Sequence, residues 1–358
     1  MASDIGFLPF ESFLILLICS FGVVTNLLTV VVFWHRKFRR QIIFKCLLIK
    51  SLAQLVYLSI NLASVFFTCG LKCFNQLSSI YGIVISLYLN NFLASSLVIF
   101  ILLVEIYVSI QRLLLVLANR RAFIWYKQTL VTLFVLTILL KVPYLMSIDV
   151  YSFNLNETTT NMTSKRYWYR STGFAATQTY AILAIGPKWL RVFLACVVLL
   201  ALNVAIALKL RSKQSNKENN TEPVVYLVSM ESGQYLVHIG SQSATAATLE
   251  SEQQRRRAVE SRQITIMILL FSVILMLAHV PYCIYFIASY FILVDQQLIN
   301  YSYYILYLIH GSSFFVFLFF SKRFRKTLKH YLLFIRRRGS KSSNEEEVHQ
   351  TILEDENL

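Results

Sequence analysis

The sequence is poor in charge: Asp, Glu, Lys and Arg make up 15% of its 358 residues, while hydrophobic residues make up 56%. Soluble domains carry about a quarter charged residues. So low a charge content excludes an ordinary water-soluble globular protein, because the folded chain would expose too much apolar surface unless lipid covered it. Glycine is also scarce, with 10 residues. The chain has no phosphate-binding glycine loop, no HExxH and no suitably placed GxSxG, so we predict neither an enzyme nor a cofactor or metal site.

Cysteine is too rare for a disulfide scaffold, because the six cysteines are scattered along the chain. Four lie within apolar runs and are expected to be plain packing residues. Cys69 and Cys73 lie close together in a segment expected outside the cell, where disulfides persist. A local bridge between them and a pair of free thiols both stay open.

Long apolar runs are what the sequence has in quantity. A membrane-spanning helix needs roughly 20 largely apolar residues. Seven segments qualify: about Phe13–Phe33, Ile42–Phe67, Ser79–Leu113, Thr129–Ile148, Leu190–Leu210, Ile264–Phe291 and Tyr301–Phe320. The fifth is the weakest, because Lys188, Trp189 and Arg191 lie at its start. We expect these three at the membrane interface, where basic and aromatic side chains prefer to lie.

Positive charge gathers between alternate apolar runs. Of the 34 Lys and Arg residues, 27 fall in four segments: Arg36–Lys50, Arg112–Lys127, Lys209–Arg262 and Lys322–Lys341. This alternation is what the positive-inside rule requires of cytosolic segments. The net charge of +16 therefore indicates topology and contact with anionic membrane lipids, and no nucleic-acid partner is expected.

The charge pattern divides the chain into three parts. We expect a short extracellular N-terminus (residues 1–12), a transmembrane domain (13–335) and a cytosolic tail (336–358). Residues 212–262 form a polar cytosolic loop without a spanning run, predicted to be largely disordered. Residues 321–334 predict an amphipathic helix in the headgroup layer. Asn156 and Asn161 start two glycosylation sequons on the side assigned as outside. The fold expected is an all-α membrane protein, a seven-transmembrane helix bundle with an amphipathic eighth helix.

Six short motifs occur in order along these spans. Asn26-Leu27-Leu28-Thr29-Val30 matches GNxxV without its glycine, and Ser109-Ile110-Gln111-Arg112 resembles the Asp/Glu-Arg-Tyr end of a third helix. Leu202-Asn203 resembles a fifth-helix ending, and Ala278-His279-Val280-Pro281 occupies a CWxP site. His310 to Phe317 stands where NPxxY belongs, and Ser321-Lys322-Arg323-Phe324-Arg325 resembles the start of an eighth helix. The chain thus resembles a rhodopsin-like (class A) G-protein-coupled receptor, of a divergent invertebrate peptide-receptor or chemoreceptor type.

The resemblance implies a plasma-membrane receptor that binds an extracellular ligand and signals to a heterotrimeric G protein. It assigns the activation switch to six residues: Arg112, Asn203, His279, Pro281, Ser313 and Phe317. In the family, the arginine holds the resting state and then meets the G protein. Because Gln111 precedes it here, an ion pair would need Glu260 or Glu252, and without one the basal signalling should be high. A snorkelling arginine is the plain alternative. His279 is either a proton-sensitive switch or a neutral, hydrogen-bonded histidine.

Several polar residues depart from the family pattern. Ser51 stands where the second helix usually has an aspartate, and Ser313 also replaces an amide or acid, so no sodium site is expected. Glu105 lies deep in an apolar run, where a carboxylate costs about 2–3 kcal/mol unless it is paired or protonated. We propose a displaced polar core in its place, made of Asn26, Lys50, Ser51, Glu105 and His310, together with Ser313. The alternative is that Lys50 snorkels to the cytosol and Glu105 is protonated.

The resemblance also places a ligand crevice between the third, fifth, sixth and seventh helices. Nine residues are expected to face it: Tyr88, Asn91, Ala94, Ser95, Lys141, Tyr282, Phe286, Tyr303 and Tyr307. Ala94 stands where amine receptors have an aspartate, and Tyr307 where opsins have the retinal lysine. The tyrosines favour a neuropeptide or a small organic molecule. Alternatively, many of these rings are interface or packing residues.

Three other functions remain open from sequence alone. A transporter would show internal repeats and matched helix breaks, which are absent from this sequence. A seven-helix ligand-gated chemoreceptor channel, as in insect odorant receptors, would place the N-terminus inside, against the charge bias. A receptor-like membrane protein that no longer couples to G protein would explain the number of altered motifs.

Overall fold

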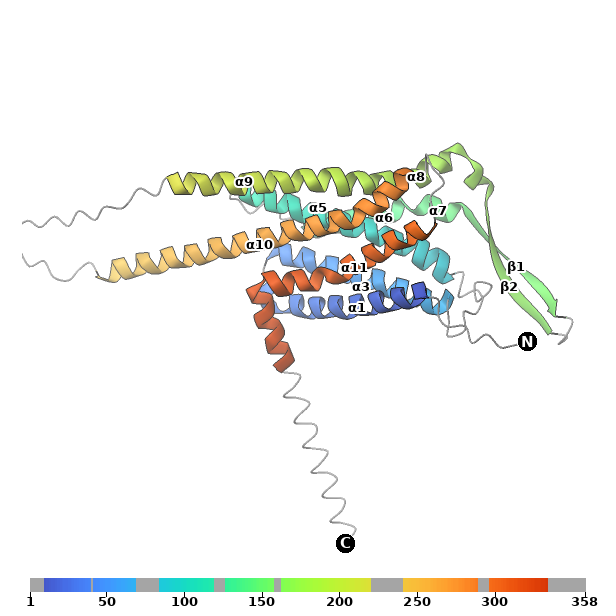
Figure 1. The fold of residues 1–358 in the computed structure, drawn as a ribbon, viewed down its shortest axis with the longest axis horizontal. Coiled ribbons are helices and arrows are strands. Elements are labelled where there is room, and N and C mark those ends of the chain that lie inside the picture. Colours follow the sequence, from blue (N-terminus) through green and yellow to red (C-terminus); the bar gives the residue numbers. More distant parts are fainter. Residues whose placement is uncertain are drawn as a thin grey trace, which may run out of the picture.

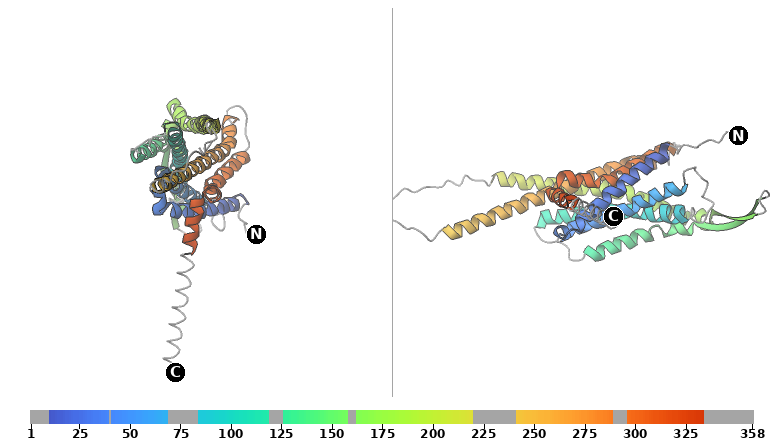
Figure 2. Two further views of the ribbon diagram at one scale, coloured as in Figure 1. Left: turned by 90° about the vertical axis from the view of Figure 1, so that its left-hand side faces the viewer. Right: turned by 90° about the horizontal axis from the view of Figure 1, so that it is seen from below.

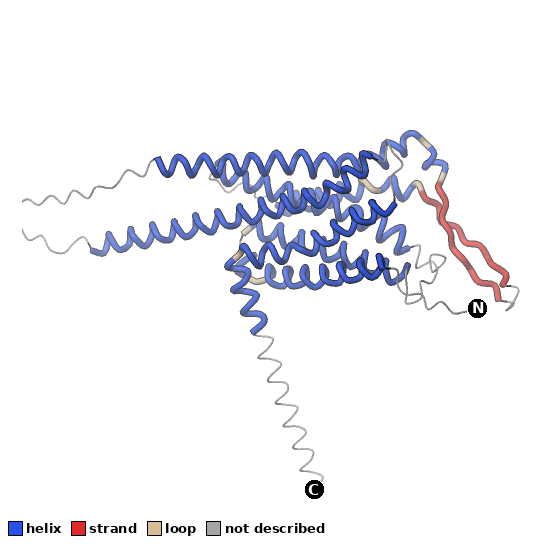
Figure 3. The backbone as a smooth tube through the Cα atoms, in the orientation of Figure 1, coloured by secondary structure: helices blue, strands red, loops and turns tan. Residues whose placement is uncertain are grey.

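The computed structural model describes seven stretches of the chain: residues 10–39, 41–68, 84–118, 126–157, 162–219, 241–288 and 296–333. Its long helices run side by side along one direction (Figures 1 and 3). They are α1 (Phe10–Trp34), α3 (Ile42–Thr68), α5 (Ser95–Ala118), α6 (Tyr126–Leu139), α8 (Gln178–Phe193), α9 (Leu199–Asn219), α10 (Ser241–Ala288) and α11 (Gln296–Phe320). Shorter helical pieces complete the bundle: α2 (Arg36–Arg39), η2 (Val84–Ala94), α7 (Val142–Met146), η3 (Gly173–Ala176) and η4 (Leu194–Val198).

Six helices among the described residues are long and apolar enough to cross a membrane. Their spans are Ser12–Trp34, Ile42–Val65, Leu87–Leu117, Tyr126–Met146, Gln263–Tyr282 and Tyr301–Phe320. The expectation of a helical, multi-pass membrane protein is therefore confirmed. The run of α8, η4 and α9, which contains the fifth predicted span, is continuous helix but is not one of the six; Lys188 and Arg191 lie within it.

The third crossing forms the centre of the bundle. Of the most apolar window in Leu87–Leu117, 78% is buried, against 11% for Tyr126–Met146. Accordingly α5 contacts α3, α6, α9 and α10, whereas α6 lies at the side. On the other flank, α1 packs against α3 and α11, and α11 packs against α10 (Figure 2). Polar residues on α5 are thus the best placed to meet several helices at once.

An antiparallel hairpin projects from one end of the bundle (Figure 1). It consists of β1 (Ile148–Glu157) and β2 (Met162–Ser171), and follows directly after α7. Asn156 pairs with Thr163 near its far end, so the first sequon lies at the tip. Polar residues alternate with Phe153 and Leu155 in the sequence, which is typical of a strand, although no strand was predicted here.

Helix extends into the segment that was predicted to be a disordered loop. At the end of the bundle opposite the hairpin, α9 continues to Asn219 and α10 begins at Ser241 (Figure 1). The prediction is therefore wrong for residues 212–219 and 241–262. The physical reason lies in composition, since residues 241–262 contain neither glycine nor proline and are rich in Ala, Glu, Gln and Arg, which favour helix.

A further helix follows α11 over residues 322–333 and turns away from the bundle axis (Figure 1). Ser321 begins it, because the Ser321 hydroxyl accepts a hydrogen bond from the backbone N–H of Phe324 at 3.2 Å. Phe324 is fully buried, while Leu332 is 54% exposed. One end of the predicted apolar face therefore anchors this helix to the bundle, and the other end is uncovered by protein.

Candidate functional site

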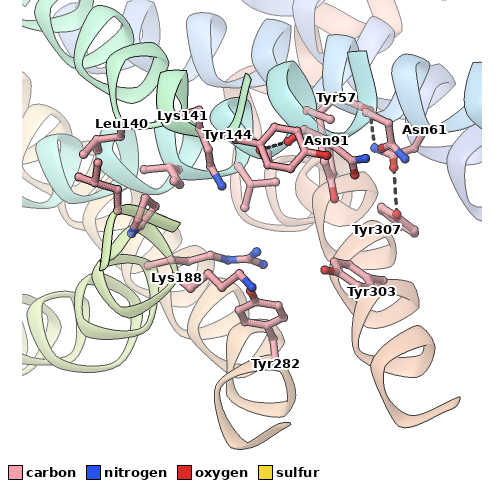
Figure 4. A pocket seen from close by; sticks show the side chains of 18 of the residues that line it. Tyr57, Asn61, Asn91, Leu140, Lys141, Tyr144, Lys188, Tyr282, Tyr303 and Tyr307 are labelled. Atoms are coloured by element: carbon pink, nitrogen blue, oxygen red, sulfur yellow. Dashed lines mark hydrogen bonds between the residues drawn. The ribbon is translucent and has the colours of Figure 1, made fainter. Parts of the chain in front are cut away.

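A cavity of about 510 Å³ opens among the helices near the end from which the hairpin projects (Figure 4). Its wall comes from α3, η2, α5, α7, α8, α10 and α11, together with Lys141 between α6 and α7. Seven of the nine predicted ligand residues line it: Asn91, Ala94, Ser95, Lys141, Tyr282, Tyr303 and Tyr307. The volume lies in the range of small-molecule sites, about 300–1,000 Å³.

The other two predicted ligand residues stand apart from this wall. Tyr88 lies on η2 but is 45% exposed and does not line the cavity. The side chain of Phe286 is outside the part of the chain that the structure describes. Tyr57 and Asn61 on α3 take part instead. They were missed because the family pattern directs attention to other helices.

Two basic residues of α8 also line the cavity, namely Lys188 and Arg191. The expectation that both lie at the lipid interface is wrong for Arg191, which is only 8% exposed. Its guanidinium lies 4.1 Å from the centre of the Tyr282 ring. Trp189, by contrast, is 45% exposed. The spacing of these residues could have predicted this, because residues 188 and 191 are three apart and lie on one face of a helix, whereas residue 189 lies on another.

Tyrosine rings lead from this cavity toward the middle of the bundle. Tyr282 and Tyr303 lie 6.1 Å apart by ring centres, and Tyr303 stacks on Tyr307 at 6.4 Å. Tyr307 donates a hydrogen bond to the side-chain oxygen of Asn61 at 2.9 Å. The ring of Tyr57 meets Tyr307 at 5.8 Å and His310 edge-on at 5.1 Å. Aromatic contacts thus join the cavity wall to a buried histidine.

A buried ion pair and one further hydrogen bond connect three helices, α3, α5 and α10. The ammonium of Lys50 on α3 pairs with the carboxylate of Glu105 on α5, and both side chains are at most 2% exposed. On α10, the Ser272 hydroxyl donates to the second carboxylate oxygen of Glu105 at 2.8 Å. The Lys50 ammonium also lies 3.3 Å from the ring centre of Phe271. Sequence reasoning proposed Lys50 as the partner of Glu105 but missed Ser272 and Phe271.

A second polar network connects α1, α3 and α11. Gln54 contacts the Nδ1 atom of His310 at 3.2 Å and accepts a hydrogen bond from Ser313 at 3.1 Å. Asn26 donates to the backbone carbonyls of Gly22 at 2.8 Å and His310 at 3.0 Å. The proposed polar core is therefore divided into two parts, with Gln54 as an unpredicted member. Ser51 is buried beside Lys50 on α3.

The remaining residues that were predicted to form the activation switch are mostly buried. Arg112 is 2% exposed and its Nε atom has no hydrogen-bond partner among the described residues. Neither amide atom of Asn203, on α9, has such a partner. His279 donates from Nδ1 to the carbonyl of Leu275 at 2.8 Å, two residues before Pro281, which lies inside α10.

Phe317 lies in an aromatic cluster where the family motif has a tyrosine. Its ring meets Phe33 on α1 at 4.8 Å, Phe271 on α10 at 5.9 Å and Phe324 at 5.8 Å. Because Phe324 belongs to the helix over residues 322–333, the cluster fixes that helix to the end of the bundle. Ring packing alone holds Phe317 in this cluster.

Some predicted features fall outside the residues described. These are Cys69, Cys73 and Asn161, and the side chains of Asn156, Glu252 and Glu260. The proposed partner of Arg112 is therefore not among the contacts above. No known protein-family model matches the chain, and no relative is found among curated proteins.

Proposed function

We propose that this protein is a rhodopsin-like G-protein-coupled receptor of the plasma membrane. It binds an extracellular peptide or small organic ligand in the cavity beside Tyr282 and signals to a heterotrimeric G protein. The observation that carries the proposal is the contact path from this cavity, through Tyr303, Tyr307 and Tyr57, to the buried polar network of His310 and Gln54. A ligand that displaces these rings would disturb the contacts between helices directly.

The proposed topology has seven crossings, with the run of α8, η4 and α9 as the fifth. The N-terminus and the hairpin then lie outside, and the glycosylation sequons at Asn156 and Asn161 face the secretory lumen during synthesis. The extended ends of α9 and α10 enter the cytosol, where the triplet Arg255-Arg256-Arg257 suits the positive-inside rule. The helix over residues 322–333 is the amphipathic eighth helix, lying in the headgroup layer.

In this proposal the resting state is held by Glu105 rather than by a partner of Arg112. Glu105 on the central helix α5 binds both Lys50 on α3 and Ser272 on α10. Movement of α10 away from α5 must break the bond with Ser272. A hydrogen bond to a charged group contributes about 1.5–3 kcal/mol, which is enough to bias a two-state equilibrium about tenfold to hundredfold.

Recruitment of G proteins by the full-length protein in cells tests this function. At matched surface levels, the wild type should recruit at least one class of G protein without added ligand, and Arg112→Gln should recruit several-fold less. Arg170→Gln is the matched control, because Arg170 is 70% exposed on the hairpin and its contacts are with other hairpin residues, Asp149 at 3.4 Å and the Tyr151 ring at 5.6 Å. Absence of recruitment by the surface-expressed wild type for every class would contradict the proposal.

A receptor-like protein that does not couple is the second candidate. The observation that favours it is Gln111, which precedes Arg112 where the family motif has an aspartate or glutamate. The two candidates give opposite results in the recruitment experiment. A ligand-gated channel would instead give ligand-dependent membrane currents in cells lacking G proteins.

A further inference from the structure

The described lining of the cavity contains three basic residues, Lys141, Lys188 and Arg191, and no acidic one. Figure 4 shows Lys141, from the turn between α6 and α7, and Lys188, from α8, directed into the same space. The buried carboxylate of Glu105 on α5 is already bound to Lys50. Three cations around one cavity repel one another, so the wall favours a ligand that brings negative charge.

Arg191 is the strongest member of this group. It is 92% buried, since its exposed fraction is 8%, and its Nε and Nη2 atoms have no hydrogen-bond partner among the described residues. Its contact with the Tyr282 ring at 4.1 Å holds the guanidinium in place. A buried guanidinium without an acceptor is costly. Its flat row of N–H groups matches the two oxygens of a carboxylate.

The rest of the wall is suited to the body of such a ligand. Tyr282, Tyr303 and Tyr307 present rings, which take aromatic or aliphatic groups. Asn61 and Asn91 add amide groups that fix orientation. The volume of about 510 Å³ admits a small organic acid or the last residues of a peptide.

We propose that the cavity binds the carboxylate of an organic acid or of a peptide C-terminus, and that Arg191 receives it with Lys141 and Lys188 adding charge. This inference rests on the proposed function, since it names the ligand class of the same site. A free acid and a peptide C-terminus share this chemistry, and the two arms of the test distinguish them.

The test measures the thermal unfolding temperature of the purified full-length protein in lipid nanodiscs. One arm uses 4-hydroxyphenylacetate, N-acetyl-phenylalanine and N-acetyl-leucine; the other uses tripeptides ending in Phe, Tyr or Leu. Each acid is compared with its own carboxamide, which has the same shape without the charge. A ligand that binds the folded state raises the unfolding temperature. We expect acids of at least one arm to raise it and their amides to raise it less.

Variants then assign the effect to Arg191. Arg191→Gln should abolish the difference between acid and amide, Arg191→Lys should reduce it, and Arg170→Gln on the exposed hairpin should keep it. Without ligand, Arg191→Met should unfold at a higher temperature than the wild type, because it removes an unpaired buried charge. This second measurement tests the role of Arg191 even if Arg191→Gln folds poorly.

Two results would overturn the inference: no acid of either arm exceeding its amide, or an acid effect that persists in Arg191→Gln. The assay contains no G protein, so its failure is separate from failure of the proposed function. G-protein recruitment together with a negative acid series would reject the carboxylate ligand and leave the receptor function standing. Acid binding without G-protein recruitment would support the carboxylate ligand and reject the receptor function.

Discussion

At the scale of single residues, Lys50 and Glu105 neutralise each other inside the bundle. Removing one partner of a buried pair leaves an uncompensated charge, at a cost of about 3–5 kcal/mol, whereas replacing both with apolar groups is often neutral. Lys50→Met alone should therefore lower the unfolding temperature and the yield of monodisperse protein, and Lys50→Met with Glu105→Leu should restore both. Lys45→Met, on the same helix but half-buried, is the matched control.

If the double variant unfolds at as low a temperature as Lys50→Met alone, the ion pair is not the main contribution of Lys50 to stability. The cation–π contact with Phe271 would then be the larger contribution. Phe271→Leu separates the two contacts, because it removes the ring while it keeps the charges of Lys50 and Glu105.

Charged residues were the buried polar residues most readily predicted from the sequence. A carboxylate in an apolar run demands a partner, so Glu105 and Lys50 were found. Gln54 and Ser272 are neutral and common in membrane helices, and nothing in their spacing distinguishes them from other polar residues. Arg191 was detected but misplaced, because basic residues at the start of a span normally lie at the interface. Its burial depends on how α8 rotates against α10, which only tertiary packing determines.

At the scale of elements, α1 and α11 approach closely through two glycines. A Cβ atom added at Gly311 would lie 2.9 Å from the Cα atom of Gly22, which is backbone and cannot turn aside. Thr25 bridges the same contact by donating to the Gly311 carbonyl at 2.8 Å. Small residues allow membrane helices to pack in this way.

Gly311→Ala should therefore force α1 and α11 apart. We expect a loss of about 1–3 kcal/mol, in the range of overpacked cores, seen as a lower unfolding temperature. Gly186→Ala on α8 is the control, because nothing lies within 4 Å of its added Cβ, and helix propensity should make it neutral or slightly stabilising. Equal behaviour of the two variants would contradict the close contact.

Elements were predicted well where a long apolar run defined them and poorly elsewhere. The seventh segment, Tyr301–Phe320, has the predicted bounds. The hairpin was missed because its alternation of polar and apolar residues is short, and because the sequence of its second strand mixes basic and aromatic residues. The helical ends over residues 212–219 and 241–262 were missed because polarity was taken as disorder, although their composition favours helix.

At the scale of the whole molecule, the bond between Ser272 and Glu105 ties α10 to the central helix. If the protein is a receptor, Ser272→Ala should raise ligand-free G-protein recruitment several-fold at equal surface expression, because the resting arrangement loses one contact. Ser312→Ala is the control, since the Ser312 hydroxyl bonds to the carbonyl of Ile309 in its own helix, at 2.9 Å. Unchanged recruitment in Ser272→Ala, with coupling intact, would mean that the hydrogen bond between Ser272 and Glu105 does not hold the resting state.

The number of crossings fixes the relation between the two termini. Six crossings place both on the same side of the membrane, and seven place them on opposite sides. The run of α8, η4 and α9 is not among the six spans, and it contains Lys188 and Arg191. However, Arg191 is buried against Tyr282 and Lys188 lines the cavity. A charge that faces the bundle interior does not have to enter lipid, so this run can still cross.

We therefore expect the termini on opposite sides. In intact cells, an antibody should label an N-terminal tag, and a C-terminal tag should become accessible only after permeabilisation. Enzymatic removal of glycans should increase gel mobility in the wild type but not in Asn156→Gln combined with Asn161→Gln, because both sequons then lie outside. Labelling of both tags in intact cells, or of neither, would mean that α8 and α9 lie along the bundle without crossing. In that case the cavity would keep its cationic wall but lose its place in a seven-helix receptor.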